Sequence, residues 1–375
     1  MIITVILPNL CGGGAERLHV NLARDWVVRG YTVEFVLMRK KGELLQLLPN
    51  EVKVTDMSVD RIRSFIFPLA RHLKNSRPNT ILAAMWPLTS AVVCSWILSG
   101  RTGSLFLSDH EHLSHSYIGQ RRVKGAYLKN LIRFTYPFAN GVIAVSAGVK
   151  NDLCALGRLS LSKVKVIYNP AAIGVSSVRE SIKVRNKLWG DYKYNILAVG
   201  RLTAEKNYET LIKAFARLPI EMNAKLIILG EGNLRVALTD LIAALGLHER
   251  IELFGFVSDP YPWFRSSDLF VLSSLWEGFG NVIVEALECG VPVVSTDCPS
   301  GPAEILENGR YGKLVPVGDF VRLSSAMIDS LLETHDREAM KLRAKDFLVE
   351  KISAQYLAYM FPNGLLHRNE NVIEL

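Results

Sequence analysis

Short apolar runs rich in β-branched residues alternate along this chain with segments of helical period, and the alternation restarts near residue 194. Continuous apolar strands separated by helices are typical of parallel sheets covered on both faces. The sequence therefore predicts an α/β protein. The first set of predicted strands is Ile2–Leu7, Thr32–Leu37, Ile81–Ala84, Leu105–Leu107, Val142–Val145 and Val164–Tyr168. The second set is Tyr194–Gly200, Lys225–Leu229, Ile251–Phe254, Leu269–Leu272 and Val291–Ser295.

Two consecutive arrays of this kind predict two Rossmann-like, doubly wound domains. The length of 375 residues agrees, because a single domain usually holds roughly 100–200 residues. We expect a first domain over 1–170, a linker over 171–193 and a second domain over 194–350. A C-terminal helix and tail follow over 351–375, and this helix can cross back to the first domain. Ligands bind outside the carboxyl ends of such strands, so the two domains should face each other across a cleft that holds the active site.

Charge separates the two halves of the chain. Residues 1–190 hold 26 Lys and Arg against 11 Asp and Glu, whereas residues 191–375 hold 18 against 25. The basic half suits nucleic acid, an anionic membrane or a phosphorylated substrate, and charge alone does not choose among them. The five cysteines are scattered without a C-x-x-C pair, which favours reduced thiols in a cytoplasmic protein over a disulfide framework or a zinc site.

One apolar stretch, residues 80–98, has nearly the length of a membrane span. Pro87 and several hydroxyl side chains interrupt it, so a strand, a turn and a packed helix fit better. The first strand has no basic region ahead of it, so we expect no signal peptide.

Two loops with glycines follow predicted strands and open predicted helices. Gly12-Gly13-Gly14 follows the first strand, where three glycines allow a phosphate to approach the backbone. Arg17 stands where a G-x-G-x-x-G motif needs its third glycine, so a tight turn without a ligand is equally consistent. Arg201 and Lys206 follow the first strand of the second domain. These two cations suit a diphosphate, and ordinary solvated surface charges are the alternative.

Glu277 and Glu285 lie eight residues apart on either side of a predicted helix N-terminus, Gly278-Phe279-Gly280-Asn281. Paired carboxylates first suggest a glycosidase, in which two acids flank the scissile bond. In the alternative interpretation they accept hydrogen bonds from the hydroxyls of a sugar and a ribose. Taken alone, Glu285 is also consistent with an acid on a helix surface.

Together these motifs closely resemble glycosyltransferase family 4. The likeness extends over nearly the whole chain and is weakest in residues 40–140 and in the linker. It implies a GT-B fold and a retaining enzyme that uses a nucleotide-sugar donor. The residues that carry it are Gly200-Arg201-Leu202, Glu205-Lys206-Asn207, Glu277 with Glu285, Cys298-Pro-Ser-Gly-Pro-Ala-Glu-Ile-Leu-Glu-Asn-Gly309, and Gly12-Gly-Gly-Ala-Glu16.

The resemblance implies a role for each matching residue. Arg201 and Lys206 would neutralise the donor diphosphate, and Glu277 would hydrogen-bond the donor sugar. A residue after the strand at 105–107, often His in the family, contacts the donor sugar; His110 is the first candidate here and His112 the second. The other implied contacts are the backbone N–H groups of Phe279, Gly280 and Asn281, the ribose partner Glu285, Glu231 in the nucleotide pocket, Val257 at the base, and Gly13 and Gly14 over the phosphates.

No metal site or other cofactor is expected, because the nucleotide sugar is itself a substrate. The sequence contains no Asp-x-Asp motif, and the histidines at 110, 112 and 115 have no Cys set to support a zinc site. Cations and helix N-termini can stabilise a leaving diphosphate without Mg²⁺.

Residues 121–133 carry five cations among aromatic and aliphatic residues: Arg121, Arg122, Lys124, Lys129 and Arg133. With the basic first half, this pattern indicates an amphipathic helix on an anionic membrane, and a surface helix packed on the sheet is the alternative. We therefore expect a cytoplasmic protein held peripherally at the inner face of the plasma membrane.

The favoured function is transfer of a hexose or N-acetylhexosamine from a nucleotide sugar, a UDP-sugar first, to a glycan acceptor in bacterial surface polysaccharide or glycoconjugate synthesis. A lipid-linked acceptor such as a polyprenyl-diphosphate glycan suits the membrane expectation. A nucleotide-sugar epimerase or a glycan phosphorylase on the same fold is the alternative. Nucleic-acid binding is a distant one, because the Lys and Arg residues are dispersed and form no recognition motif.

Overall fold

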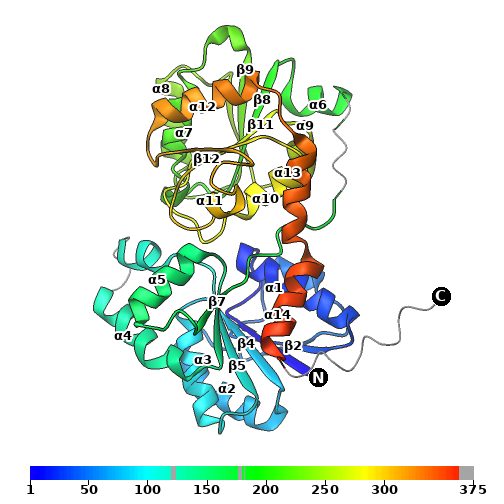
Figure 1. The fold of residues 1–375 in the computed structure, drawn as a ribbon, viewed down its shortest axis with the longest axis vertical. Coiled ribbons are helices and arrows are strands. Elements are labelled where there is room, and N and C mark those ends of the chain that lie inside the picture. Colours follow the sequence, from blue (N-terminus) through cyan, green and yellow to red (C-terminus); the bar gives the residue numbers. More distant parts are fainter. Residues whose placement is uncertain (120–123, 176–179, 181, 363–375) are drawn as a thin grey trace, which may run out of the picture. The chain divides into compact units, whose positions relative to one another are not determined.

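The computed structural model describes residues 1–119, 124–175, 180 and 182–362. The chain divides into two compact units (Figure 1). Unit 1 consists of Met1–Pro170 and the segment that begins at Val349, and unit 2 consists of Ala171–Leu348. Each unit is built around one fully parallel sheet, which confirms the predicted α/β class.

Unit 1 contains a seven-stranded sheet in the order β3-β2-β1-β4-β5-β6-β7. The chain runs outward from β1 to β3 and then returns to the other side of β1, which is a doubly wound topology. The strands are β1 (Ile2–Leu7), β2 (Thr32–Leu37), β3 (Lys53–Asp56), β4 (Thr80–Ala84), β5 (Ser104–Asp109), β6 (Gly141–Ala144) and β7 (Val164–Val166). The α-helices are α1 (Gly14–Val28), α2 (Ile62–Ser76), α3 (Leu88–Leu98), α4 (Gly125–Thr135), α5 (Ala147–Gly157) and α14 (Val349–Met360).

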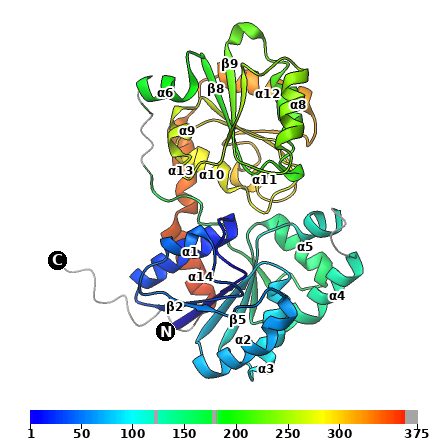
Figure 2. The same cartoon turned by 180° about the vertical axis from the view of Figure 1, so that it is seen from behind.

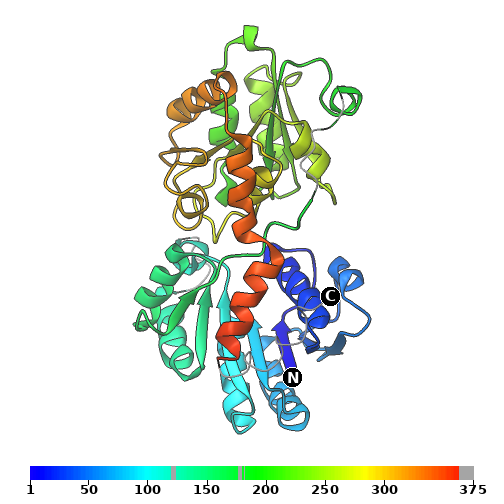
Figure 3. The same ribbon diagram turned by 45° about the vertical axis from the view of Figure 1, so that its right-hand side comes forward.

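The last helix of the chain completes the core around the first strand. α14 lies beside α1, as Figure 3 shows, and Ile3 and Val5 of β1 share one apolar core with both helices. Trp26 of α1 and Tyr356 of α14 are fully buried there, with ring centroids 6.5 Å apart. The remaining helices, α2 to α5, form a second layer in which each helix contacts the next (Figure 2).

Unit 2 contains a six-stranded sheet in the order β10-β9-β8-β11-β12-β13, which is the strand order of a dinucleotide-binding domain. The strands are β8 (Tyr194–Val199), β9 (Ala224–Leu229), β10 (Ile251–Gly255), β11 (Leu269–Leu272), β12 (Val293–Thr296) and β13 (Lys313–Val315). The α-helices are α6 (Ile182–Trp189), α7 (Tyr208–Phe215), α8 (Arg235–Ala244), α9 (Tyr261–Ser266), α10 (Asn281–Glu288), α11 (Pro302–Ile305), α12 (Phe320–Leu332) and α13 (Arg337–Ala344). One core joins β8, β9 and β11 to α7, α8 and α12.

Among the elements that the sequence analysis does not single out are β3, β13 and α6. β3 and β13 are short edge strands with little buried surface, so they lack the apolar run by which the central strands are recognised. α6 lies within residues 171–193, where the sequence shows no clear period and indicates a linker. By contrast, residues 80–98 form β4 and α3 on either side of Trp86-Pro87, as expected. Within the described part of the chain, every helix is too short or too polar to cross a bilayer.

The first residues of this expected linker are fixed to unit 2 by one carboxylate. Glu288 Oε1, near the end of α10, accepts hydrogen bonds from the backbone N–H groups of Ile173, Gly174 and Val175 at 3.1, 2.7 and 3.2 Å. The Tyr261 hydroxyl donates to Glu288 Oε2 at 3.3 Å. Glu288 is buried, so its carboxylate satisfies buried donors and holds residues 173–175 in place.

Candidate functional site

The loops after β8, β9 and β10 are joined at the carboxyl edge of the unit 2 sheet. The Gly200 N–H donates to the Leu229 carbonyl at 2.9 Å, and the Gly230 N–H donates to the Gly255 carbonyl at 2.8 Å. Gly230 has a φ of 144°, and a Cβ there would collide with the Gly200 carbonyl oxygen. Glycine is therefore required at 230 for the two loops to approach this closely.

Lys206 and Glu277 form an ion pair at this edge. Lys206 Nζ lies 2.6 Å from Glu277 Oε1, and the two side chains are only 16% and 11% exposed. The Ser274 hydroxyl donates to the same Glu277 oxygen at 2.6 Å, and the Ser273 hydroxyl donates to the Lys206 carbonyl at 2.8 Å. The loop after β8 and the loop after β11 are thus locked together, and the pair is formed before any ligand binds.

The polar neighbours of this pair remain uncharged at neutral pH. Burial raises the pKa of the Tyr208 hydroxyl above its ordinary range, and the Glu277 carboxylate adds to the shift. Burial also raises the pKa of the Cys298 thiol to about 12, again with a contribution from Glu277. The charged groups of this cluster are therefore Lys206 and Glu277.

The N-terminus of α10 follows Glu277 within a few residues. Gly280 is its N-cap residue, with a φ of 100° in the left-handed region that favours glycine. Phe279 is 2% exposed and packs on Phe347 with ring centroids 5.5 Å apart, so its side chain belongs to the core. Gly301 lacks the Cβ that would collide with the Phe279 carbonyl. The Phe279 side chain is thus unavailable to a ligand. The backbone of residues 279–281 can still bind one, at a helix N-terminus that carries partial positive charge.

Arg201, the other predicted diphosphate ligand, lies on the loop after β8 but does not join the ion pair. Its side chain is 76% exposed, and its Nη2 lies 3.3 Å from Glu205 Oε1. Arg201 is thus a solvated cation that can move, whereas Lys206 is fixed.

The remaining predicted residues of unit 2 lie on neighbouring loops or on α10. Glu231 follows β9; its carbonyl accepts from the Leu202 N–H at 2.9 Å, and its half-exposed carboxylate pairs with Arg235. Val257 follows β10 and is partly exposed. Glu285 lies one turn into α10 and is also partly exposed. All of them come from the carboxyl side of the same sheet.

In unit 1, Gly13 and Gly14 open α1, with Gly13 as the N-cap residue in extended conformation. The Glu16 carboxylate lies against Gly13, at the place where a Cβ would be, and the Glu43 carboxylate lies in the same way against Gly12. A carboxylate near a helix N-terminus interacts favourably with its partial positive charge. An anionic ligand at this loop would therefore have to share the position with Glu16.

His110 follows β5, and its ring meets a second imidazole. The His110 and His19 centroids lie 5.3 Å apart in an edge-on arrangement, and His110 Nε2 is 3.0 Å from the Ser108 hydroxyl. The sequence gives no sign of His19, since its place on α1 is that of an ordinary core residue. His112 Nδ1 instead lies 3.4 Å from Asp152 Oδ2 of α5, and its ring packs at a tilt of 55° against His115, so His112 fixes this loop to α5.

Asp109, just before His110, is a buried acid that the sequence analysis did not single out. It is 1% exposed, and its Oδ2 accepts a hydrogen bond from the Tyr136 hydroxyl at 2.7 Å. The Thr89 hydroxyl lies 2.9 Å from the same tyrosine oxygen. Burial raises the pKa of Asp109 to about 7, against the opposing effect of the Tyr136 hydrogen bond.

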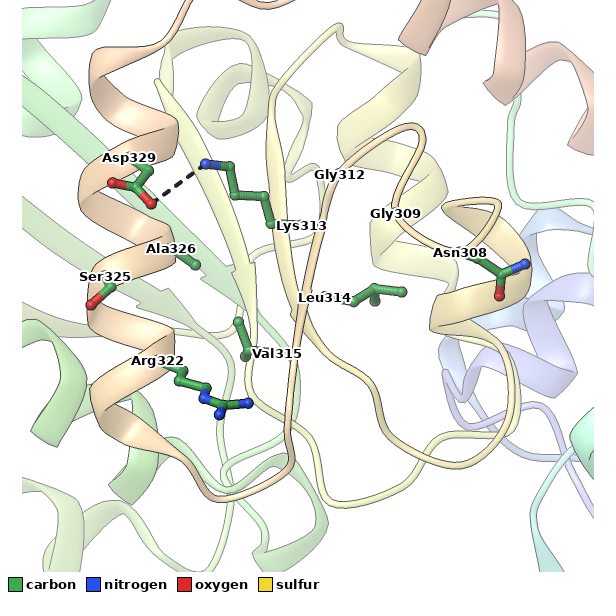
Figure 4. Close-up of a pocket in the computed structure, with 10 residues that line it drawn as sticks. All are labelled: Asn308, Gly309, Gly312, Lys313, Leu314, Val315, Arg322, Ser325, Ala326 and Asp329. Carbon is green, nitrogen blue, oxygen red and sulfur yellow. Dashed lines mark ion pairs between the residues drawn. The ribbon is translucent and has the colours of Figure 1, made fainter.

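A separate open pocket of about 430 Å³ lies between β13 and α12 and contains none of the predicted site residues. In Figure 4 the Lys313 side chain points toward Asp329, 3.8 Å away, beside the apolar Leu314 and Val315. Lys313 also pairs with Glu333, and Arg322 with Asp319, so these cations belong to surface ion pairs away from the loops described above. In the described part of the chain, no group of three or more His, Cys, Asp and Glu side chains is arranged to hold a metal ion.

Two doubly wound parallel sheets, the second ending in a fixed ion pair and a helix N-terminus, define the GT-B class of glycosyltransferases. Family models confirm the class: residues 12–173 match "Glycosyltransferase Family 4", and residues 180–347 match "Glycosyl transferases group 1". The chain therefore belongs to these glycosyltransferases, with one family domain in each unit.

The chain is also similar to individual proteins in sequence and in structure. The chain is 36% identical over 240 residues to the N-acetylgalactosamine-N,N'-diacetylbacillosaminyl-diphospho-undecaprenol 4-alpha-N-acetylgalactosaminyltransferase of Campylobacter jejuni, a match that spans 62% of this chain and 63% of the relative. It is 25% identical over 358 residues to the N-acetyl-alpha-D-glucosaminyl L-malate synthase of Bacillus anthracis, covering 92% of each. The structure of Anabaena Alr3699/HepE with UDP and glucose shares the fold, with a TM-score of 0.79, 22% identity, and coverage of 96% of this chain and all of that one.

The buried Asp109 generates a prediction about stability. Because its pKa is raised from about 3.8 to about 7 on folding, its contribution to stability is complete below pH 4 and is lost as the pH rises through 7. Asp109→Asn removes this titration while keeping an acceptor for Tyr136. Between pH 5 and pH 8, urea unfolding should show the wild type losing roughly 2–3 kcal/mol relative to the variant. Glu51→Gln, at an exposed acid of the same unit, should follow the wild type; equal pH dependence in wild type and Asp109→Asn would contradict the assignment.

Proposed function

We propose that the protein is a retaining glycosyltransferase that moves a hexose or an N-acetylhexosamine from a UDP-sugar to a glycan acceptor. The observation that carries this proposal is the preformed Lys206–Glu277 pair at the carboxyl edge of the unit 2 sheet, in a chain of this family. Retention of anomeric configuration follows from the family resemblance.

The donor is proposed to lie along the loops that follow β8, β9, β10 and β11. Lys206 and the mobile Arg201 bind its diphosphate, and Glu277 accepts hydrogen bonds from its sugar hydroxyls. Glu277 Oε1 already accepts from Lys206 and Ser274, so the second oxygen, Oε2, is the one offered to the sugar. Glu285 binds the ribose hydroxyls.

Three other contacts complete this donor site. The backbone at Phe279, Gly280 and Asn281 meets the sugar and phosphates, because the Phe279 side chain is buried away from solvent. The loops at Glu231 and Val257 line the nucleotide pocket. Glu231 follows β9, the neighbour of β8, and Val257 follows β10, the next strand out, so both lie at the carboxyl edge of the sheet.

The reaction breaks the bond between the anomeric carbon and the diphosphate oxygen, and the electron pair stays with the leaving diphosphate. The acceptor hydroxyl oxygen forms the new bond to the anomeric carbon, and its proton passes to the diphosphate. Positive charge near the leaving oxygen stabilises the transition state, typically by several kcal/mol for a well-placed group. Lys206, Arg201 and the α10 N-terminus supply such charge, so we propose that turnover requires no metal ion.

The names of the relatives support the substrate classes. The Campylobacter relative is named for a diphospho-undecaprenol acceptor, and the Anabaena structure holds UDP and glucose. We therefore propose a UDP-sugar donor and a lipid-linked glycan acceptor in bacterial surface polysaccharide or glycoconjugate synthesis. In unit 1, His110 is proposed to contact the donor sugar, because His112 is engaged with Asp152. Gly13 and Gly14 are proposed to lie over the phosphates.

We also propose that unit 1 binds an anionic membrane, at the inner face of the plasma membrane, through α4. Tyr127 and Phe134 are 58% and 65% exposed and lie seven residues apart, on one side of the helix. Lys129 and Arg133 lie four residues apart on the exposed surface beside them, while Leu128 and Ile132 face the core. Aromatic and cationic stripes side by side are typical of helices at a membrane interface. Arg121 and Arg122 lie outside the described residues.

A panel of nucleotide sugars tests the function, first by thermal shift and then by analysis of the products. A UDP-sugar at a hundredfold excess over its dissociation constant should stabilise the wild type by about 2.7 kcal/mol. Transfer should then lower the donor concentration only when acceptor is present and should persist in EDTA. Epimerisation of the donor, or phosphorolysis of a glycan, would establish the alternative enzymes, and an inverted product would contradict retention.

Lys206→Met keeps the side-chain length and removes the charge from the diphosphate site. Since one lost transition-state contact of this kind costs about 10²–10³ in turnover, kcat should fall by that factor. Lys213→Met, on α7 and paired with Glu209 at the surface, is the matched control and should retain wild-type turnover. Near-normal turnover in Lys206→Met would remove the proposed role.

Liposome sedimentation tests the proposed membrane surface. At about 1 kcal/mol per cation near an anionic surface, Lys129→Gln with Arg133→Gln should weaken binding to phosphatidylglycerol vesicles by one to two orders of magnitude. Tyr127→Ser with Phe134→Ser should weaken it further in high salt, where charge is screened. The control is Lys213→Gln with Arg217→Gln, a cation pair of the same spacing on unit 2. Unchanged sedimentation of both α4 variants would place the membrane contact elsewhere.

A further inference from the structure

Two imidazoles, the fully buried His19 and the partly exposed His110, meet at the carboxyl edge of the unit 1 sheet. His19 lies in the second turn of α1, after the glycine loop, and His110 directly follows β5. Their centroids are 5.3 Å apart and their planes meet at 70°, so one ring presents its edge to the other. Burying a polar ring costs free energy unless its nitrogens are hydrogen-bonded, so the hydrogen bonds of each ring matter here.

His19 is fixed in one tautomer by its helix. It is 0% exposed, and its Nδ1 lies 2.7 Å from the Ala15 carbonyl oxygen. A carbonyl only accepts, so Nδ1 must carry the hydrogen and donate. The other nitrogen, Nε2, is then a bare acceptor, and it has no hydrogen-bond partner among the described residues.

His110 is fixed from the opposite side. Its Nε2 lies 3.0 Å from the hydroxyl of Ser108, which is itself 0% exposed. Its Nδ1 has no hydrogen-bond partner within the described part of the chain. Ser108 of β5 and His19 of α1 therefore contact the His110 ring from two different elements.

Both rings are neutral at physiological pH. Burial lowers the pKa of His19 to about 4, against the opposing effect of the Ala15 carbonyl. Burial lowers the pKa of His110 well below its ordinary value, and His19 adds to this shift.

We propose that His19 is a positioning residue for His110: it packs against the His110 ring, excludes water from it, and so holds it in one orientation as an uncharged imidazole. The proposal rests on the proposed function in one respect only, that His110 contacts the donor sugar. The packing of His19 on His110 and the protonation state of His110 involve residues of unit 1 only, so they can be tested without a substrate.

An uncharged His110 suits the proposed chemistry. Glycosyl transfer passes through a transition state with positive charge on the sugar ring, as in glycoside hydrolysis. An imidazolium next to that ring would repel the developing charge, whereas a neutral imidazole does not. His19 thereby affects turnover without touching the substrate.

The other titratable groups around His110 do not replace His19 in this role. Asp109, from the same strand, is engaged with the Tyr136 hydroxyl. Tyr356 of α14 borders Ser108, and burial raises its pKa to about 12, so it stays neutral. Glu111, on the following loop, is exposed to solvent. His19 of α1 is the titratable side chain in ring contact with His110.

Histidine NMR on the full-length protein tests the proposal without any substrate. In protein labelled at histidine Cε1, the His110 resonance, assigned through His110→Gln, should not titrate between pH 8 and pH 5 in the wild type. In His19→Ala, water enters the vacated space and the His110 resonance should titrate with a midpoint near the ordinary pKa of about 6.5. His19→Phe restores the ring volume and should return His110 to the non-titrating state. If His19→Ala does not fold, His19→Val, which leaves a smaller cavity, takes its place.

Kinetics provide the second measurement. Between pH 8 and pH 5.5, the kcat of His19→Ala relative to that of the wild type should fall about tenfold, with the KM for the donor little changed, while the ratio of His19→Phe to the wild type stays constant. His72→Ala is the matched control, since His72 is a partly buried histidine of unit 1 paired with Glu34, and its ratio to the wild type should also stay constant.

Two results would overturn the proposal: titration of His110 near pH 6.5 in the wild type, or a non-titrating His110 in His19→Ala. If the NMR shifts occur as expected but no sugar is transferred from any donor, the imidazole pair stands and the proposed function fails.

Discussion

Every strand pairing in both sheets is parallel, and this one constraint determines where chemistry can occur. Parallel strands end at a common edge, and the loops that leave them are brought together whatever their separation in sequence. In unit 2 this convergence of loops brings Lys206, which follows β8, to Glu277, which follows β11. Lys206 Nζ lies 2.6 Å from Glu277 Oε1. In unit 1 the convergence places His110, which follows β5, beside the helix that leaves β1. The backbone bond between Gly230 and Gly255 shows the same convergence between β9 and β10.

The two units present contrasting electrostatic environments at these edges. In unit 2 a nearly buried cation is held by a carboxylate and a hydroxyl, beside the N-terminus of α10. In unit 1 the buried groups are two neutral imidazoles and an acid whose pKa lies close to 7. A charged leaving group suits the first environment and a sugar hydroxyl suits the second. The contrast between the two environments therefore follows from burial and from what each group is bonded to.

Sequence patterns predict the central strands well and the finer parts of the site poorly. The strand runs at 2–7 and 32–37 coincide with β1 and β2, because a strand buried on both faces must be apolar throughout. The edge strands β3 and β13 are less buried and need no continuous apolar run, so the sequence does not indicate them. Lys206 and Glu277 are recognisable from their motif. Ser274, Tyr208 and His19, however, are ordinary residues in sequence, and only the tertiary contact gives each its role. No local pattern reports that Arg201 is solvated while Lys206, five residues on, is fixed.

The placement of α14 has a consequence for the order in which the chain can fold during synthesis. Unit 2 is one uninterrupted segment, whereas unit 1 needs α14, which is made only after all of unit 2. The core around β1 includes Ile352, Tyr356 and Met360, so β1 packs against a helix that is synthesised only after the whole of unit 2. At 5–20 residues per second, the nascent protein spends roughly 10–40 s between completing β7 and completing α14. During that interval the nascent first unit exposes an apolar groove over β1 and α1, a natural binding place for a chaperone at the ribosome exit, while unit 2 has its whole sequence available and can fold ahead of the domain that precedes it.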